Sequence, residues 1–398
     1  MDDSQLSLYL EINYSNYIFY VSSNDNQNNF KIIHESKVTL DGIEKNSISD
    51  FKKVFNIIKE NVYIIEQKFN YTFKDIILIL DNFNLTFINM TGFKKLNGSQ
   101  VLKENIFYIL NTLKSCVDEI ETKKNILHIF NSKFTLDNKN IENLPIGLFG
   151  DFYSHELSFS LIDKNDYKNL NNIFDNCNLK IKKLLIKSFV KGANISDNSK
   201  NTDTFFYINI CKNNSKIFFF ENNSLKLEQN FKFGSDIIIK DISKVTSLKI
   251  DTVEELLNKI ELKKEISPEE LIEKDLFTDS VYRKIKKKLL YEIAFARIKE
   301  IYEIILFYNI NFKFYDKISN KIFLEINHKT QSKCFKEMFQ TLSLENGNPN
   351  LSFIENSSSE KMLGTANKLV HFGWKKEAIP VSQSQKSLIA RFFDAIFS

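Results

Sequence analysis

The chain has 398 residues, of which 43% are hydrophobic and 26% are charged, and its formal net charge at pH 7 is +4. This composition is typical of a globular protein that can bury the cores of more than one domain. The near balance of charge excludes a strong nucleic-acid footprint, and no apolar run approaches the ~20 residues that cross a bilayer. The four scattered cysteines are typical of reduced thiols in a cytosolic protein, and the acidic start MDDSQ is unlike a signal peptide.

Hydrophobic periodicity predicts the elements of the chain in order. The first half is predicted to contain a strand pair at 6–21, an amphipathic helix at 48–68, a buried strand at 75–80, a helix within 97–120, strands at 125–137 and 155–162, a helix at 165–178 and a strand at 180–189. The second half is predicted to contain a hairpin at 205–220, helices at 253–263, 279–308 and 330–342, and a strand at 321–326. The order strand, hairpin, helix occurs twice, which predicts a duplicated α/β architecture, and no short repeat indicates a solenoid.

Glycine is scarce in this chain, so the glycines that remain are informative. Only 10 glycines and 4 prolines occur, and only three of the 54 basic residues are arginines, as is typical of a compact AT-rich genome. Pro145, Gly147 and Gly150 nevertheless fall within six positions. Glycine is retained where the backbone conformation requires it. This turn, between the strands at 125–137 and 155–162, is therefore predicted to be a defined feature, with an ordinary loop as the alternative.

Five segments in chain order form a recognisable pattern. They are LSLYLEINYSNYIFYV (6–21), the stretch 125–162 with its Pro-x-Gly-x-x-Gly turn, KFGSDIIIKDIS (232–243), Lys259-Ile260-Glu261, and MLGTANKLVHFGW (362–374). Together they resemble the bacterial FtsA family of cell-division proteins, which has the actin-like ATPase fold. The resemblance implies an α/β, actin-like (ribonuclease H-like, duplicated) fold with an inserted SHS2-type α+β subdomain and a C-terminal amphipathic helix. It places a first actin-like subdomain at 1–83 and 164–200, the insert at 84–163, a second actin-like half at 201–376, and a flexible linker with a membrane-targeting helix at 377–398.

The resemblance also implies a nucleotide site, from which this sequence departs. In the second phosphate hairpin the family has Asp-Ile-Gly-Gly-Gly-Thr-x-Asp, where this chain has NICKNNSK, so that Asn209 and Lys216 replace both carboxylates. In the first hairpin Gly-Thr becomes Asn13-Tyr14, although Glu11 keeps an acidic side chain, and in a third element Thr-Gly-Gly becomes Glu325-Ile326-Asn327. Carboxylates orient Mg²⁺, and glycines let phosphate approach backbone N–H groups.

These losses predict a pseudo-ATPase without a catalytic residue, metal or cofactor, with weak ATP binding left open. The residues that the resemblance assigns to a degenerate nucleotide site are Glu11, Asn13, Asn209, Asn213, Asn214 and Lys259. No other catalytic arrangement replaces them, because the five histidines are isolated and no GxSxG, HExxH or GxxxxGK[ST] motif occurs.

The C-terminal segment KSLIARFFDAIFS (386–398) is predicted to be an amphipathic helix that binds a membrane. At about 100° per residue its large apolar side chains occupy one half of the helix. These side chains are Leu388, Ile389, Phe392, Phe393, Ile396 and Phe397. The predicted linker precedes the segment, and the family also ends in a linker and a membrane helix. A terminal helix docked on its own domain is the alternative.

The resemblance implies a cell-division adaptor that tethers the FtsZ polymer to the cytoplasmic face of the membrane at the division site. The implied partners are the FtsZ C-terminal tail, other division proteins, further copies of this chain and the membrane, but no nucleic acid. A run of lysines lies in the region that binds the acidic FtsZ tail in the family, with a solvated charge run as the alternative; it consists of Lys284, Lys286, Lys287 and Lys288. The rival functions are a PilM-like protein of type IV pilus assembly and a residual actin-fold ATPase.

Overall fold

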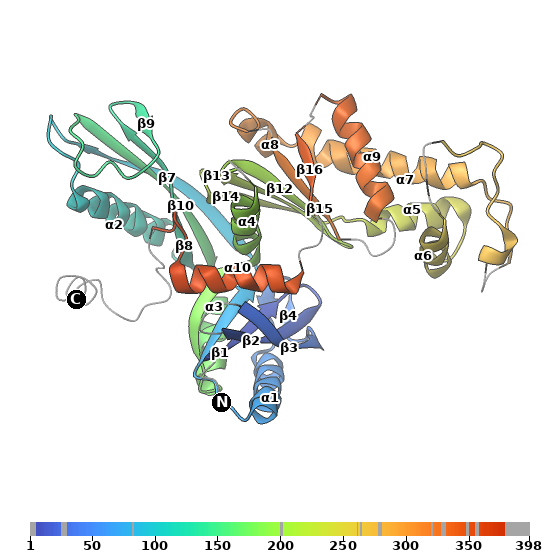
Figure 1. Ribbon diagram of the computed structural model, residues 1–398, viewed down its shortest axis with the longest axis horizontal. Helices are drawn as coiled ribbons and strands as arrows, with labels where there is room; N and C mark the ends of the chain where they lie inside the picture. The colour runs from blue at the N-terminus through green and yellow to red at the C-terminus, as the bar shows by residue number, and fades with distance from the viewer. Residues whose placement is uncertain are drawn as a thin grey trace. The chain divides into compact units, whose positions relative to one another are not determined.

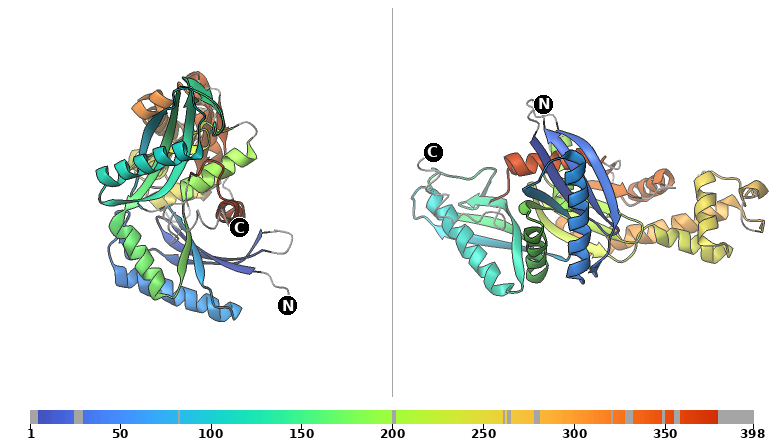
Figure 2. Two further views of the ribbon diagram at one scale, coloured as in Figure 1. Left: turned by 90° about the vertical axis from the view of Figure 1, so that its left-hand side faces the viewer. Right: turned by 90° about the horizontal axis from the view of Figure 1, so that it is seen from below.

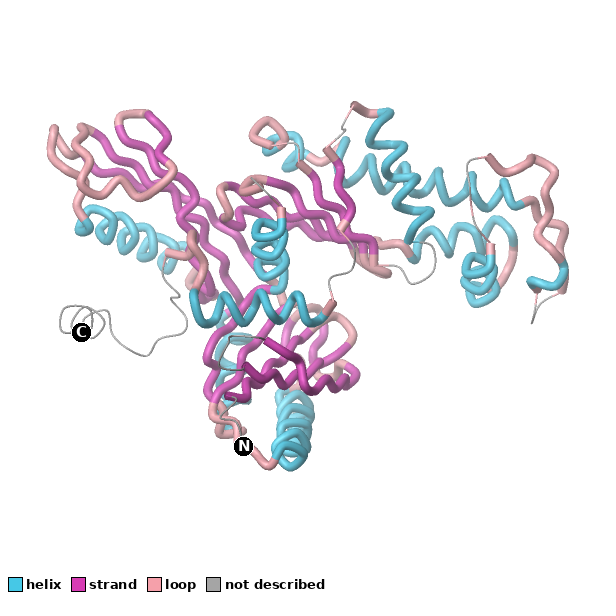
Figure 3. Tube along the Cα trace, viewed as in Figure 1, coloured by secondary structure: helices cyan, strands magenta, loops and turns pink. Residues whose placement is uncertain are grey.

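The computed structural model describes residues 5–24, 30–81, 83–199, 202–260, 262, 265–277, 281–319, 321–327, 332–347, 350–354 and 358–378 (Figure 1). The chain divides into two compact units. The first comprises residues 1–203, 221–226 and 358–398, and the second comprises residues 204–220 and 227–357. Both units contain strands and helices, as Figure 3 shows.

The central sheet of the first unit has the strand order β11-β6-β1-β2-β3. Its strands are β1 (Gln5–Ile12), β2 (Asn16–Asn24), β3 (Phe30–Thr39), β6 (Asp75–Leu80) and β11 (Lys180–Ile186). The first three are antiparallel, whereas β6 pairs parallel to β1 and β11 pairs parallel to β6. The sequence pattern does not predict β3, because the polar run HESK at 34–37 interrupts the apolar residues of this edge strand.

The sheet of the second unit repeats this order as β14-β13-β12-β15-β16. Its strands are β12 (Phe205–Ile210), β13 (Ser215–Glu221), β14 (Ser224–Phe231), β15 (Ile322–Ile326) and β16 (Leu351–Phe353). As in the first sheet, the first strand forms a hairpin with the second and pairs parallel to the fourth. The two sheets therefore have the same topology, which confirms the predicted duplication.

Local sequence explains why α1 (Phe51–Phe69) forms where it does. The Asp50 carboxylate accepts a hydrogen bond from the Lys53 N–H at 3.0 Å and so caps the first turn. The helix ends at Asn70, which has a left-handed conformation. Its buried residues recur every three or four positions: Val54, Ile58, Val62 and Ile65. It contacts α3 (Lys164–Asn176) in the same unit.

A separate sheet of order β7-β10-β8-β9 lies between β6 and α3 in the chain. It consists of β7 (Leu85–Lys95), β8 (Lys124–Leu136), β9 (Lys139–Ile141) and β10 (Phe152–Asp163), and α2 (Lys103–Ile120) packs on one face (Figure 2). These elements span the range predicted for the insert. Gly147 in its turn has a φ of +87°, and a Cβ on Gly150 would lie 2.5 Å from the Leu136 side chain. Glycine therefore suits position 147 through its backbone conformation and position 150 through the little space beside Leu136, and the SHS2 assignment stays a prediction.

Helix boundaries differ from the sequence prediction in two places. The predicted strand at 180–189 ends at Ile186, and α4 (Lys187–Asn198) begins with the next residue. The predicted helix at 279–308 begins only at Lys287, because residues 281–286 are not helical. It continues as α7 (Lys287–Tyr302), a π-helical turn (Glu303–Phe307) and then α8 (Ile310–Tyr315).

The remaining helices of the second unit are α5 (Asp236–Thr246), α6 (Ile250–Lys259), the 3₁₀ turn Lys274–Leu276 and α9 (Ser332–Glu345). They enclose one apolar core with the strands of the second sheet. In the first unit, the short strands β4 (Ile43–Glu44) and β5 (Ser47–Ile48) form a hairpin before α1.

The last described helix, α10 (Ser359–Phe372), belongs to the first unit and contacts α4 and β3. The sequence prediction assigned it to the second half, which it placed at 201–376. The fold also continues through Glu377 and Ala378, the first two residues of the predicted linker, because both contact β8. Among the described residues, no helix combines the length and apolar character that a bilayer-crossing segment needs.

Candidate functional site

The first hairpin closes through a side chain rather than through glycine. Between β1 and β2, the side-chain oxygen Oδ1 of Asn13 accepts hydrogen bonds from the backbone N–H groups of Ser15 at 3.0 Å and Asn16 at 2.8 Å. The Asn13 amide also donates to Glu11 at 3.3 Å. Such a turn is typical of asparagine, whose side chain replaces a backbone partner. The Asn13 oxygen is thus engaged in the turn itself.

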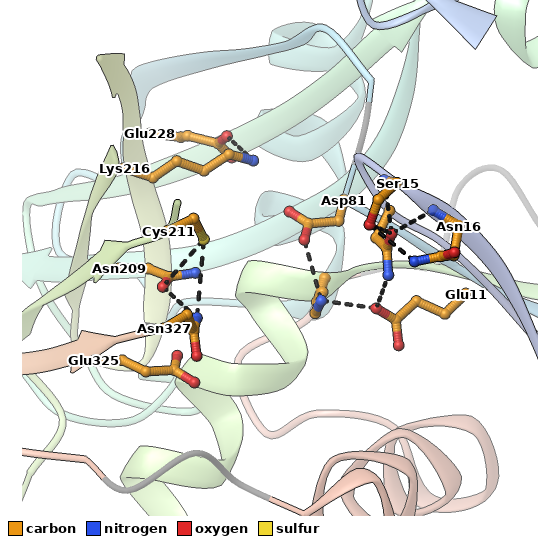
Figure 4. Close-up of polar contacts among 12 residues, drawn as sticks. Glu11, Ser15, Asn16, Asp81, Asn209, Cys211, Lys216, Glu228, Glu325 and Asn327 are labelled. Carbon is orange, nitrogen blue, oxygen red and sulfur yellow. Dashed lines mark hydrogen bonds and ion pairs between the residues drawn. The ribbon is translucent and has the colours of Figure 1, made fainter. Parts of the chain in front are cut away.

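Glu11 lies buried at the end of β1 and pairs with a lysine. The Lys187 ammonium, at the start of α4, is 2.7 Å from Glu11 Oε1 and 3.1 Å from Asp81 Oδ2 (Figure 4). Asp81 directly follows β6, the parallel neighbour of β1. Although burial alone would lower the pKa of Lys187, the charges of Asp81 and Glu11 raise it well above its usual range. The lysine is therefore a permanent cation between two carboxylates.

The second hairpin joins β12 and β13 without glycine. Asn209, at its first carboxylate position, accepts a hydrogen bond from the Asn327 side-chain amide at 2.8 Å. The Asn327 backbone N–H in turn donates to the carbonyl of Ile210 at 2.8 Å. These contacts tie the hairpin to the end of β15 (Figure 4). An amide pair of this kind stabilises the strand ends but carries no charge for a metal ion.

The hairpin tip holds the start of α5. The N–H groups of Ser235 and Asp236 donate to the carbonyl oxygens of Cys211 and Lys212, each at 2.9 Å. The approach is so close that a Cβ on Gly234 would lie 2.2 Å from the Cys211 oxygen. The first N–H groups of a helix need partners from outside the helix. The tip supplies these partners, so its carbonyl groups have a structural role.

Two buried charges of the second unit are also paired. Lys216, at the second carboxylate position, lies 3.1 Å from Glu228 on β14, and both side chains are at least 90% buried. Glu325 on β15 is buried and accepts a hydrogen bond from the Tyr207 hydroxyl of β12. Isolated buried charges are costly, whereas pairing and hydrogen bonds compensate them. Both residues therefore fit the interior of the second sheet.

Comparison with known proteins places this geometry in context. No family model matches the chain. The chain is 22% identical over 276 residues to "Cell division protein FtsA" of Buchnera aphidicola subsp. Schizaphis graminum (strain Sg), covering 69% of this chain and 65% of that protein. It is 20% identical over 254 residues to "Cell division protein FtsA" of Buchnera aphidicola subsp. Acyrthosiphon pisum (strain APS), covering 64% and 60%. The chain thus matches less than two thirds of the length of either relative.

Among solved structures, a chain of the "PilM-PilN type IV pilus biogenesis complex" superposes with a TM-score of 0.53 and 10% sequence identity, covering 92% of this chain and 98% of that chain. At this identity the likeness concerns the fold alone. The structural likeness agrees with the sequence matches and with the duplicated sheet topology. This chain has the actin-like ATPase fold and is distantly similar in sequence to FtsA proteins.

In this FtsA-like protein, the structure distributes the predicted nucleotide-site residues over both units. Glu11 and Asn13 lie in the first unit, and the other four belong to the second. Asn213 and Asn214 sit in the hairpin tip, where the Asn214 carbonyl accepts a hydrogen bond from Cys211 at 2.9 Å. Lys259 is exposed at the last position of α6, and its neighbour Glu261 lies outside the described residues.

Sequence reasoning missed Lys187 and Asp81. Lys187 neutralises Glu11, and Asp81 is the second carboxylate that contacts the same ammonium group. Lys187 is 176 residues from Glu11 in the chain, and it was assigned to a strand. A signal existed for Asp81 alone, because a carboxylate directly after a buried parallel strand faces the edge where such sites form. Glu228 and Tyr207, which compensate Lys216 and Glu325, gave no signal in the sequence.

The residues of the FtsA-like chain do not fit a magnesium–phosphate group of the kind that the fold family implies. The Glu11 carboxylate already binds an ammonium group, the second hairpin offers Asn209 and a buried Lys216, and its tip residues have no positive φ. Metal binding requires unpaired oxygen ligands, and close approach of phosphate requires a bare backbone.

The predicted lysine run is split by the structure of the FtsA-like chain. Lys284 and Lys286 precede α7, so the four lysines do not share one helix as predicted. Lys286 lies 2.9 Å from Glu269, and Lys287 lies 2.7 Å from Glu270, so these two charges are already paired. The six predicted membrane-binding residues of segment 386–398 lie outside the described residues.

Proposed function

We propose that this chain is a cell-division adaptor of the FtsA type that links the FtsZ polymer to the cytoplasmic face of the membrane without turning over ATP. The similarity to two proteins named as cell division protein FtsA supports the cell-division role. The single observation that supports the loss of catalysis is the Lys187 ammonium between Glu11 and Asp81. A tethered cation there competes with any diffusing metal ion for the same carboxylates.

Electrostatics explain why this arrangement opposes phosphoryl transfer. The transferring phosphoryl group is stabilised almost entirely by positioned cations and backbone N–H groups. A metal needs carboxylates that orient it, and Asn209 and Lys216 supply none in the second hairpin. Lys216 keeps its own partner in Glu228, so the two charges compensate each other inside the second unit. The hairpins are therefore retained as parts of the sheets.

Purified full-length protein tests the absence of turnover. We expect phosphate release from ATP at the rate of the buffer blank, both with Mg²⁺ and with EDTA. The matched control is Glu11→Gln, which removes a carboxylate that a metal would need. Magnesium-dependent release by the parent chain that Glu11→Gln abolishes would contradict the proposal. Binding of ATP without turnover is compatible with an adaptor.

A second experiment tests the adaptor role by itself. A peptide with the sequence of the FtsZ C-terminal tail should be retained by the immobilised full chain, and retention should fall as salt rises, because the tail is acidic. A scrambled peptide of the same composition is the control. Equal retention of both peptides would contradict FtsZ binding without bearing on the absence of ATP turnover.

A further inference from the structure

After α10 the chain returns to the insert and adds a short antiparallel segment to β8. The Ala378 N–H donates to the Ile129 carbonyl at 2.7 Å, and the Asn131 N–H donates to the Lys376 carbonyl at 2.7 Å. Glu377 and Phe130 are the paired residues between these bonds. Gly373, with a φ of +71°, separates the segment from α10. We call residues 374–378 the C-terminal latch.

A buried cluster of one histidine and two charged side chains holds the latch in one position. The two carboxylate oxygens of Glu377 lie 2.8 Å from His128 Nδ1 and 3.0 Å from the Lys183 ammonium. Lys183 also donates to the carbonyl of Leu369 in α10 at 3.0 Å. All three side chains of the cluster are more than 90% buried. Although burial alone would raise the pKa of Glu377, His128 and Lys183 lower it to about 2.

The latch has a second attachment through the chain's one tryptophan. Trp374 Nε1 donates to the Asn223 carbonyl at 2.8 Å, and its ring meets the edge of Phe189 at a centroid distance of 6.0 Å. Asn223 lies in the turn between β13 and β14, which belongs to the first unit. The indole is therefore a natural reporter, because its environment changes if the latch opens.

These contacts determine where the latch lies, but they add little to the stability of the fold. Buried ion pairs repay little more than their desolvation cost, yet they tolerate only one geometry. Two backbone hydrogen bonds and one indole bond connect the latch to its neighbours, and each contributes modestly. Trp374, Lys376 and Ala378 remain partly exposed. The attachment is thus specific in register and open to local release.

We infer that residues 374–378 form a detachable latch that fixes the position of Ala378 against β8, with Glu377 as the positioning residue. The inference rests on the proposed function where it concerns the membrane. With the latch closed, Ala378 is the last attached residue that the structure describes before the predicted membrane segment 386–398. With the latch open, the last attached residue is Phe372 at the end of α10, which lengthens the tether by roughly 20 Å if fully extended. A longer tether lowers the effective concentration of the membrane segment near its target.

Glu377→Gln in the full chain tests the latch, because it keeps the shape of the side chain but leaves Lys183 without its charged partner. Glu360→Gln, at an exposed position of α10, is the matched control. We expect the Trp374 emission to shift to longer wavelength and tryptic cleavage after Lys376 to be about tenfold faster in Glu377→Gln alone. Lys183→Met should change both readings in the same direction. Control-like emission and cleavage in both variants would overturn the latch.

Hydrogen exchange of the parent chain tests whether the latch detaches. The amide of Ala378 should exchange faster than the amides that join β8 to β10, because it opens locally. Exchange of all these amides at one common rate would overturn the inference even if a variant unfolds.

Vesicles that contain an anionic lipid and a dansyl-labelled lipid separate the latch from the proposed function. Energy transfer from Trp374 should differ between Glu377→Gln and Glu360→Gln at equal amounts of bound protein, because the released indole changes its distance from the membrane. Equal transfer from both would refute the positioning role. If the parent chain does not bind vesicles, the membrane part of the proposed function fails, while the emission, cleavage and exchange measurements still decide whether the latch exists.

Discussion

Replacing Lys187 by methionine removes the ammonium group that lies 2.7 Å from Glu11 and 3.1 Å from Asp81. Removing one partner of a buried ion pair costs about 3–5 kcal/mol, because the other charge stays buried. Here the side chains of Lys187 and Asp81 keep 18% and 19% exposure, so solvent relieves part of the cost. We therefore expect a loss of about 2–3 kcal/mol in the free energy of unfolding, or roughly 2–6 °C in melting temperature for a chain of this length.

Thermal unfolding followed by circular dichroism measures this loss, and the chain offers a matched control. Lys53 pairs with Asp41 at 3.3 Å, but both side chains are more than half exposed. Lys53→Met should therefore change the stability by no more than about 0.5 kcal/mol. Combining Lys187→Met with Glu11→Gln should recover part of the loss, because one of the two uncompensated carboxylates is gone. If Lys187→Met melts like Lys53→Met, the cluster does not stabilise the fold as argued.

The dependence of this effect on pH has a defined sign. The pKa of Lys187 is raised in the folded protein, so its stabilising contribution is fully present below the pKa of an unfolded lysine, about 10.4. The contribution is lost only as the pH rises through the still higher folded pKa. The difference in melting temperature between the parent chain and Lys187→Met should therefore stay constant from about pH 7 to 9. A difference that disappears within this window would contradict the ion-pair explanation.

Three further predictions follow from particular contacts. Gly234→Ala should lower the free energy of unfolding by more than about 2 kcal/mol, because the new Cβ would meet two carbonyl oxygens. Gly364→Ala in α10 should be neutral or stabilising, because the nearest neighbour of its Cβ lies at 3.7 Å. Equal melting temperatures of the two variants would contradict this prediction. Lys284→Ser with Lys288→Ser should weaken FtsZ-tail binding more than Lys286→Ser with Lys287→Ser, whose charges already pair with glutamates; fluorescence anisotropy of the peptide measures both, and the reverse order would reject the lysine assignment. Phe392→Glu should move the full chain from the vesicle-bound to the soluble fraction in sedimentation, unlike Ser387→Glu on the polar half of the predicted helix, and equal sedimentation would argue against membrane insertion.

Elements that follow from local patterns were predictable, and α1 shows why. Its cap, its buried stripe and its terminal asparagine all lie within about twenty consecutive residues. The duplication was predictable because the same order of local patterns recurs. The start of α4 was not, since the apolar residues before and after Lys187 resemble a continuing strand. Its helical start coincides with contacts to residues far away in the sequence.

Asparagine illustrates both the use and the limit of the sequence pattern. Asn46, Asn138 and Asn223 have positive φ in tight turns between strands, as expected where glycine is scarce. Asn213 and Asn214, two residues of the predicted nucleotide site, do not have positive φ. The hairpin tip thus differs from the conformation that the sequence pattern suggests, because residues of other elements contact it. One of them is Gly234 before α5, which packs against the tip. Contacts of this kind have no local signature.

Lys187 also constrains which sequences are accessible from this one by single substitutions. Losing the lysine alone leaves two carboxylates facing each other without a counter-ion, and introducing aspartate at position 209 or 216 alone adds a charge where Asn327 or Glu228 now provides the partner. Each first step toward a metal site is therefore expected to lower stability before it offers any binding. The ammonium group of Lys187 therefore disfavours single substitutions among the residues that contact it. Sequences that descend from this one are expected to vary more at the hairpin tips than around Lys187.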